Sequence, residues 1–265
     1  MALTRRISET AGLALDAYKS KCLRRRIAVR MRAVGVHTYA DYLDVLDRAP
    51  GELDRLLDAL TINVTKFFRN RETWDRVADA IAPELLIRRE GRARIWSAGC
   101  ASGEESYTLA MIFAEGAERL GHGSWVERFT IDATDIDRLS LERARAARYP
   151  SAIFSETPPE LVARYCRADG ADAFVVVDRL RERVSVRRHD LIQDPAPRAP
   201  YDLIVCRNVI IYFDRPTQEQ LLLTFHDALA PSGFLVLGKV ETIFGPARTQ
   251  LDLIEPRERI YRRPA

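Results

Sequence analysis

The sequence has no long hydrophobic run, and this absence excludes a protein that spans a membrane. Its apolar stretches are far shorter than the roughly 20 residues that a spanning helix needs. The N-terminus also lacks the apolar core of a signal peptide. We therefore expect a cytoplasmic protein that does not insert into a membrane.

Cysteine is scarce, and the four cysteines are widely separated. Cys22, Cys100, Cys166 and Cys206 form neither a Cys-x-x-Cys pair nor a cluster with histidine at metal-ligand spacing. We therefore expect reduced thiols and no metal site.

The net charge is only +3, but the basic residues gather near the N-terminus. Nine lysines and arginines lie between Arg5 and Arg32, against two acids. Within residues 18–34, apolar residues recur at helical spacing, which predicts a helix with arginines on its outer sides. Residues 39–46 and 53–60 predict two further helices. This arginine face is either simply solvated or a docking surface for an acidic partner, and the pattern leaves both interpretations open.

Further along the chain, strands and helices alternate. Apolar runs predict strands at residues 93–98, 129–134, 184–188, 203–206, 234–237 and 259–263, and helices at 104–119, 138–147 and 217–230. This alternation indicates an α/β fold with a mainly parallel sheet covered on both faces. Between residues 149 and 183 the alternation of strands and helices is interrupted. A helix and a lone strand in this segment indicate an insertion at one edge of the sheet.

Residues 94–109, RIWSAGCASGEESYTL, change from strand to turn to helix. Gly99 and Gly103 allow a ligand to approach the backbone closely, and Glu104 and Glu105 open the helix that follows. By itself this pattern fits an ordinary strand-to-helix turn equally well.

Ligands of open parallel sheets bind at the carboxyl ends of the strands, beside the point where the strand order reverses. We therefore expect the glycine turn to share one cleft with Asp135, after the second strand, and with Arg207, Asn208 and Tyr212, after the fourth.

Asp135 indicates the class of cofactor, because a carboxylate at this place can hold both hydroxyls of a ribose. Glu104 and Glu105 would repel the pyrophosphate of a dinucleotide but suit a positively charged ligand. S-adenosylmethionine carries an ammonium and a sulfonium and no phosphate. The sequence therefore favours a methyltransferase over a dehydrogenase.

Four motifs in order resemble the chemotaxis receptor glutamate O-methyltransferases, the CheR family. They are NxTxFFR at residues 63–69, WSAGCASGEE at 96–105, ATDID at 133–137 and RNVIIYF at 207–213. The resemblance implies a helical basic domain (residues 1–72) and a doubly wound, Rossmann-like class I methyltransferase domain (73–265) with a small β-subdomain at about 150–183. It also implies that S-adenosylmethionine is used to methylate glutamates on the acidic cytoplasmic helices of chemoreceptors.

The resemblance also implies a role for each motif residue. Asn63, Thr65 and Arg69 would reach the cofactor from the segment between the domains, although Thr65 is equally suited to cap a helix. Gly99, Glu104 and Glu105 would lie near the amino-acid part of the cofactor, Asp135 at the ribose, Asp190 and Leu191 at the adenine, and Arg207 and Asn208 at the methionine end. Arg69 and Tyr212 would be catalytic, facing the carboxylate that accepts the methyl group.

This chemistry requires no general base, because a glutamate is already ionised at pH 7. None of His37, His122, His189 and His226 lies in a motif. On the helical domain, Arg24, Arg25, Arg26, Arg30 and Arg32 would dock the acidic receptor helix. We expect a monomer without a nucleic-acid partner.

Two segments depart from the family pattern. Many members have His-Ser-Glu-Asn where this chain has Lys239, Val240, Glu241 and Thr242, so contacts from that loop are in doubt. The turn at residues 168–173 is shorter than in members that bind a receptor tether peptide, which favours an enzyme that does not need the tether.

Two rival interpretations remain. A nucleic-acid methyltransferase would use the arginines for phosphates, but enzymes that methylate amino groups of nucleic acids usually carry an Asn/Asp-Pro-Pro-Tyr-like loop where RNVIIYF stands. A non-catalytic adapter would retain the fold without turnover, although Asp135, Arg69 and Tyr212 are all present.

Overall fold

The computed structural model describes residue 3 and residues 6–8, 14–60 and 65–265. After a short 3₁₀ turn at Leu15–Ala17, the helical domain consists of α2 (Ser20–Ala33), α3 (Tyr39–Arg48) and α4 (Glu52–Leu60). Leu23, Ile27 and Met31 form the buried stripe of α2 and pack with residues of α3 and α4. The predicted three helices and the amphipathic pattern of the first are therefore confirmed.

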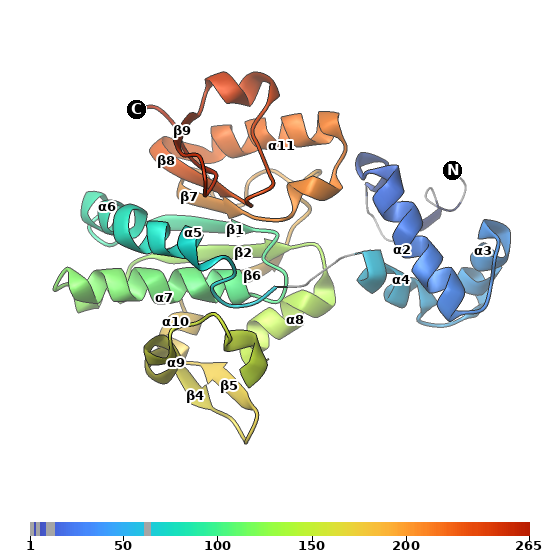
Figure 1. Ribbon diagram of the computed structural model, residues 1–265, viewed down its shortest axis with the longest axis horizontal. Coiled ribbons are helices and arrows are strands. Elements are labelled where there is room, and N and C mark those ends of the chain that lie inside the picture. The colour runs from blue at the N-terminus through green and yellow to red at the C-terminus, as the bar shows by residue number, and fades with distance from the viewer. Residues whose placement is uncertain (1–2, 4–5, 9–13, 61–64) are drawn as a thin grey trace.

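The rest of the chain forms a three-layer α/β domain, drawn to the left of the helical domain in Figure 1. Its sheet contains β1 (Arg94–Ala98), β2 (Thr130–Asp135), β6 (Val184–Arg188), β7 (Tyr201–Cys206), β8 (Leu229–Leu237), β9 (Asp252–Glu255) and β10 (Ile260–Arg262). The helices are α5 (Arg71–Arg76), α6 (Ala82–Arg88), α7 (Glu104–Arg119), α8 (Arg138–Ala146) and α11 (Arg215–Ala228), and a π-helical turn (Val77–Ile81) joins α5 to α6.

The strand order is β6-β2-β1-β7-β8-β10-β9. The first five strands in this order are parallel, and β10 and β9 add to them in antiparallel fashion. The chain moves outward from β1 in one direction through β2 and β6, and in the other through β7 and β8. The strand order therefore reverses between β1 and β7, which creates a crevice beyond their carboxyl ends.

Alternate residues of the strands lie on opposite faces of the sheet and pack into two separate hydrophobic cores. On one face Ile95 and Val205 pack with α5 to α7, and on the other Trp96 and Ile204 pack with Phe225 of α11. Phe67, Phe68 and Trp74 also belong to the first of these cores, so the segment after residue 65 packs with the sheet and not with α2 to α4.

All six predicted strands of the main sheet and the three predicted helices are present within a few residues of the predicted ends, and the doubly wound fold is confirmed. The edge strand β9 was missed. The prediction of a lone strand in the insertion was wrong, because β5 (Ala173–Val176) is the centre of an antiparallel sheet of order β3-β5-β4. β3 (Arg148–Pro150) and β4 (Cys166–Ala168) are too short to show an alternating pattern.

The insertion also contains α9 (Pro159–Tyr165) and is followed by α10 (Asp178–Arg181); short 3₁₀ turns lie at Gly123–Glu127, Ser151–Phe154, Ile210–Tyr212 and Gly245–Thr249. Among the described residues, no helix has both the length and the apolar character needed to cross a bilayer.

Candidate functional site

A cavity opens at the carboxyl ends of β1, β2 and β7, at the crevice where the strand order reverses. The structure brings ten of the predicted cofactor and catalytic residues into its lining: Thr65, Arg69, Gly99, Glu105, Asp135, Asp190, Leu191, Arg207, Asn208 and Tyr212. Three loops far apart in the sequence therefore meet as expected. Asn63 lies outside the described residues.

The glycine turn after β1 is shaped by close backbone packing. Gly99 has a φ of +80°, and a Cβ atom there would lie 2.5 Å from Cγ2 of Val209. The N–H groups of Gly99 and Cys100 both donate to the carbonyl of Thr134, at 2.8 and 2.9 Å. Only glycine fits the first position, and the two hydrogen bonds hold the turn against the end of β2.

Asp135 is fixed by this turn. Its Oδ2 accepts the N–H of Ala101 at 2.8 Å, and its Oδ1 accepts the N–H of Asp137 at 3.0 Å. A carboxylate offers about four acceptor positions, so each oxygen retains capacity for a further donor. Burial raises the pKa of Asp135, because it disfavours the charged form.

Of the two acids expected beside the cofactor, the structure places only Glu105 at the cavity. Ser97 Oγ donates to Glu105 at 2.9 Å from within β1. Glu104 is 3% exposed and accepts the hydroxyl of Ser102 at 2.8 and 2.9 Å, away from the cavity lining. Consecutive residues of a helix point about 100° apart, so α7 can direct only one of the pair inward.

Glu105 is electrostatically unusual. Burial raises its pKa to about 7, against the opposing effects of Arg207 and of the hydrogen bond from Ser97. A carboxyl group in a cavity with a pKa near 7 is typical of a ligand-binding site.

Arg207 forms another part of the cavity wall. It is 7% exposed, its guanidinium lies 4.9 Å from the ring centre of Trp74, and it donates to the carbonyl of Arg69 at 3.1 Å and to Asn70 Oδ1 at 2.9 Å. Its Nε is buried and has no hydrogen-bond partner in the described part of the chain. A buried unpaired donor is costly, so this atom is a candidate contact for an anionic group of a ligand.

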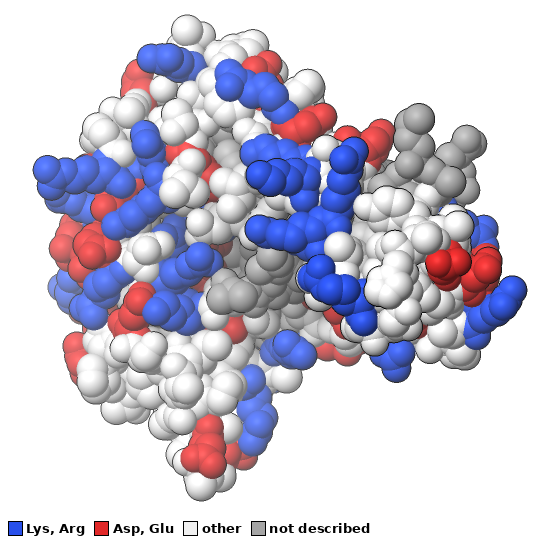
Figure 2. Space-filling view, turned by 45° about the vertical axis from the view of Figure 1, so that its right-hand side comes forward, with Lys and Arg blue, Asp and Glu red and all other residues white. Residues whose placement is uncertain are grey.

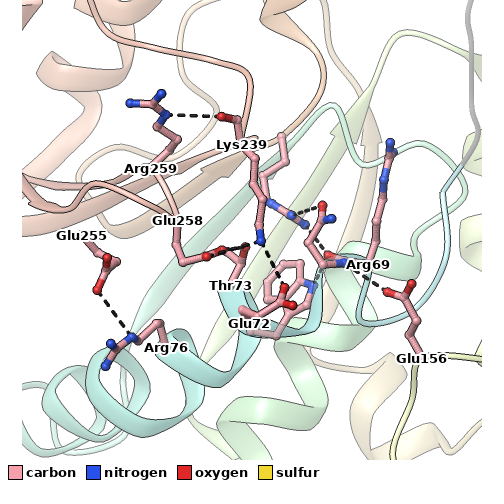
Figure 3. A network of polar contacts seen from close by, with 12 residues as sticks. Arg69, Glu72, Thr73, Arg76, Glu156, Lys239, Glu255, Glu258 and Arg259 are labelled. Carbon is pink, nitrogen blue, oxygen red and sulfur yellow. Dashed lines mark hydrogen bonds and ion pairs between the residues drawn. The ribbon is translucent and has the colours of Figure 1, made fainter.

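A polar network behind this wall holds the segment that carries Arg69 (Figure 3). Thr73 Oγ1 donates to Glu258 at 2.6 Å, and Lys239 Nζ lies 3.1 Å from Glu72 and 3.4 Å from Glu258. These contacts join α5 to the loops that follow β8 and β9. The segment therefore has a fixed position although it lies outside any strand.

Glu241 organises the loop after β7. Its carboxylate is 2% exposed and accepts four backbone N–H groups, those of Asn208 and Val209 at 2.9 Å, Gly238 at 2.6 Å and Ile211 at 3.4 Å. The loop that departs from the family pattern thus supplies the acid that shapes the Asn208 to Tyr212 segment. Residues 239–242 do not line the cavity, so this loop acts on the site through the backbone of residues 208–211.

The cavity also includes residues that sequence reasoning missed. Tyr18 comes from the helical domain, and Lys66, Trp74 and His189 come from the α/β domain; Arg26, which was predicted only for receptor docking, also lines the cavity. His189 directly precedes Asp190, so its position next to a predicted residue was the available signal. No local signal placed Tyr18 or Arg26 at the cavity, because only the packing of the two domains brings them there.

Comparison with known proteins agrees with this geometry. The family description "CheR methyltransferase, SAM binding domain" matches residues 63–259, and "CheR methyltransferase, all-alpha domain" matches residues 2–61. The chain belongs to the CheR methyltransferase family. A chemotaxis protein methyltransferase of Listeria monocytogenes is 34% identical over 244 residues, covering 92% of this chain and 90% of the relative. Chemotaxis protein methyltransferase 2 of Pseudomonas aeruginosa is 35% identical over 240 residues, covering 89% and 83%.

S-adenosylmethionine is the cofactor of this CheR domain. The chemistry of the lining fits it, because Asp135 has spare acceptor capacity for hydroxyl groups and the unpaired Nε of Arg207 can donate to a carboxylate. Asp190 is less available, since its oxygens accept the N–H of Ile192 and the amide of Gln193, each at 2.8 Å.

The basic helix α2 of this CheR protein carries two kinds of arginine. Arg24, Arg25 and Arg32 are exposed, and Figure 2 shows basic side chains gathered along the junction of the two domains. Arg30 instead donates to both oxygens of the buried Glu52, at 3.0 and 2.7 Å. Arg26 is 6% exposed and lies over the ring of Tyr212, 4.6 Å from its centre. The predicted docking set of five therefore divides into three surface residues, one internal ion pair and one cavity residue.

Proposed function

We propose that this protein transfers the methyl group of S-adenosylmethionine to glutamate side chains on the cytoplasmic helices of chemoreceptors, forming methyl esters. The observation that carries this proposal is the pair of Arg26 and Tyr212 at the cavity. Nε and Nη2 of Arg26 are buried and have no hydrogen-bond partner among the described residues. A buried guanidinium with free N–H groups favours a carboxylate as ligand.

In the proposed mechanism, the main task of the protein is to position the cofactor and the acceptor carboxylate. Asp135 would hold the ribose, Glu105 the ammonium, and Arg207 with Asn208 the methionine end of the cofactor. When bound, the cofactor supplies a methyl group on a sulfonium. Arg26 and Arg69 hold the glutamate carboxylate and Tyr212 orients one of its oxygens, so rate comes from alignment and from desolvation of the carboxylate.

One assay tests the proposal directly. Receptor cytoplasmic fragments are incubated with the protein and S-adenosylmethionine labelled in its methyl group, and the label is tested for release by alkali, which marks an ester. Alkali-labile transfer to glutamate is expected, and equal rates are expected for fragments with and without the C-terminal tether. Transfer to nucleic acid, or no transfer at all, would contradict the proposal, and a strong dependence on the tether would contradict tether independence alone.

Replacing Tyr212 by phenylalanine should lower turnover about tenfold and change affinity for S-adenosylhomocysteine less than about twofold, because only the hydroxyl that orients the acceptor is removed. The Tyr212→Phe ring still supports Arg26. Single-turnover methylation and calorimetry measure the two quantities. A variant with normal turnover would refute the role of Tyr212.

The exposed arginines predict a salt-dependent association with the acidic receptor. Replacing Arg24 and Arg25 together by alanine should weaken receptor binding about fivefold at low salt, and the difference should shrink as salt is added, because exposed charges are screened. Arg257→Ala, an exposed arginine between β9 and β10, is the control. If the double variant and the control behave alike, the α2 arginines are only a solvated face.

A further inference from the structure

The segment that carries Arg69 has an unusual backbone. Arg69 stands between Phe68, which has a φ of +52°, and Asn70, which has a φ of +62°. Residues other than glycine rarely adopt a positive φ, and they keep it only where the surrounding structure holds them. The position of Arg69 at the cavity therefore depends on contacts that come from outside the segment.

Two hydrogen bonds provide such contacts, one on each side of Arg69. The N–H of Phe68 donates to Oγ1 of Thr108 in α7 at 3.1 Å, and the N–H of Asn70 donates to Oε2 of Glu156 at 3.1 Å. The side chain of Glu156 reaches toward the segment in Figure 3. Glu156 belongs to the insertion, where it lies between the 3₁₀ turn at Ser151–Phe154 and α9. The backbone on both sides of Arg69 is thus held by two separate parts of the α/β domain.

The insertion also packs against this segment through aromatic rings. The ring of Phe67 is stacked on Phe154, with 4.4 Å between the ring centres, and meets Tyr149 edge-on at 5.0 Å. The hydroxyl of Tyr149 donates to the carbonyl of Ser102 in the glycine turn at 2.7 Å. These buried contacts fix the part of the insertion from which Glu156 extends, so its carboxylate has a defined place beside the segment.

Glu156 has a second contact, an ion pair between its Oε1 and Nζ of Lys66. The two side chains are 35% and 39% exposed, and an ion pair at this degree of exposure contributes little to stability because water screens it. The hydrogen bond to the N–H of Asn70 differs, because it acts directly on a backbone that is strained. This bond is therefore the contact through which Glu156 can control the position of Arg69.

We propose that Glu156 is a positioning residue for methyl transfer, which holds Arg69 at the cavity through the N–H of Asn70. The insertion then takes part in the reaction itself, apart from any receptor peptide that it could bind. This inference rests on the proposed function, in which Arg69 holds the carboxylate that accepts the methyl group.

Substitution of Glu156 tests the contact with Asn70. Glu156→Ala should lower the single-turnover rate of receptor methylation about fivefold, because fewer molecules hold Arg69 at the cavity. Glu156→Gln keeps an oxygen that accepts the N–H of Asn70 and loses only the charge beside Lys66, so its rate should stay within about twofold of the parent. Glu160→Ala, at an exposed site of α9, is the control. A glutamine variant as slow as the alanine variant would overturn the inference.

A double-mutant cycle tests whether Glu156 acts through Arg69. Arg69→Ala is measured alone and together with Glu156→Ala. The double variant should methylate at the rate of Arg69→Ala, because no side chain remains for Glu156 to position. Two losses that multiply would instead show a general effect of Glu156 on the protein, and the inference would be wrong.

Hydrogen exchange measures the same contact without methylation. The amide of Asn70 should exchange about fivefold faster in Glu156→Ala than in the parent, because its N–H has lost the acceptor. Glu156→Gln and the control Glu160→Ala should exchange at nearly the parental rate. A parental exchange rate in Glu156→Ala contradicts the inference.

The two measurements separate this inference from the proposed function. A parent protein that does not methylate receptor fragments contradicts the proposed acceptor, and the exchange of the Asn70 amide then decides whether Glu156 holds the segment. Parental turnover in Arg69→Ala overturns the inference, because Arg69 would have no task in the transfer. Thermal unfolding identifies the folded variants. If Glu156→Ala does not fold, Glu156→Asp, whose shorter side chain withdraws the carboxylate from Asn70, replaces it in every experiment.

Discussion

Replacing Asp135 by alanine should weaken binding of S-adenosylhomocysteine by more than about tenfold, since a charged hydrogen-bonded contact is worth roughly 1.5–3 kcal/mol. Two effects add in this variant. The ribose hydroxyls would lose the acceptor proposed for them, and the N–H groups of Ala101 and Asp137 lose theirs, so the backbone on both sides of the site is held less firmly.

Asp135→Asn separates these effects. The asparagine keeps one carbonyl oxygen for a backbone N–H but presents an amide where the second oxygen stood, so a loss between those of the parent and of Asp135→Ala is expected. Calorimetry on both variants, with thermal unfolding as the check on folding, gives the comparison. An unchanged affinity in Asp135→Ala would remove this residue from the cofactor site.

Replacing Glu105 by glutamine should stabilise the cofactor-free protein at pH 8 by about 3 kcal/mol, because a shift of one pKa unit corresponds to about 1.4 kcal/mol. The pKa of Glu105 is about 7 in the folded protein and 4.5 in the unfolded reference. The folded state therefore binds more protons between these values, and the contribution of Glu105 to stability falls as pH rises from about 4.5 to 7. Glu105→Gln lacks this titration, so its advantage should be large at pH 8 and small at pH 5.

The same variant should lose cofactor affinity. An ionised Glu105 attracts the ammonium of the cofactor, so the affinity of the parent for S-adenosylhomocysteine should rise with pH through about 7, and the profile of Glu105→Gln should be flat in that range. Urea unfolding and calorimetry across pH 5 to 8 measure the two effects. Glu142→Gln, at an exposed site on α8, is the control. A parent protein with no pH dependence of either quantity would exclude this role for Glu105.

Several site residues required the structure for their interpretation. Glu104 and Glu105 are adjacent residues of the same type, so the sequence cannot tell their roles apart. Their different directions on α7 make Glu104 the buried partner of Ser102 and Glu105 the residue at the cavity. Glu241 keeps the glutamate of the family pattern in a loop that otherwise differs from it, and its contacts to backbone N–H groups appear only in the folded structure. Arg26 and Arg30 lie on one helix face, but Glu52 engages Arg30 and Tyr212 lies under Arg26.

The sequence alone determined the fold class, the order of strands and helices along the chain, the family and the cofactor. Those features depend on hydrophobic periodicity and on residues close together in the chain, such as the glycine turn and the acid after β2. Only the tertiary structure decided which side chains share the cavity. It added Tyr18 from the helical domain and moved Arg26 from the docking surface to the cavity, because contacts between segments nearly 200 residues apart arise from domain packing and have no local pattern.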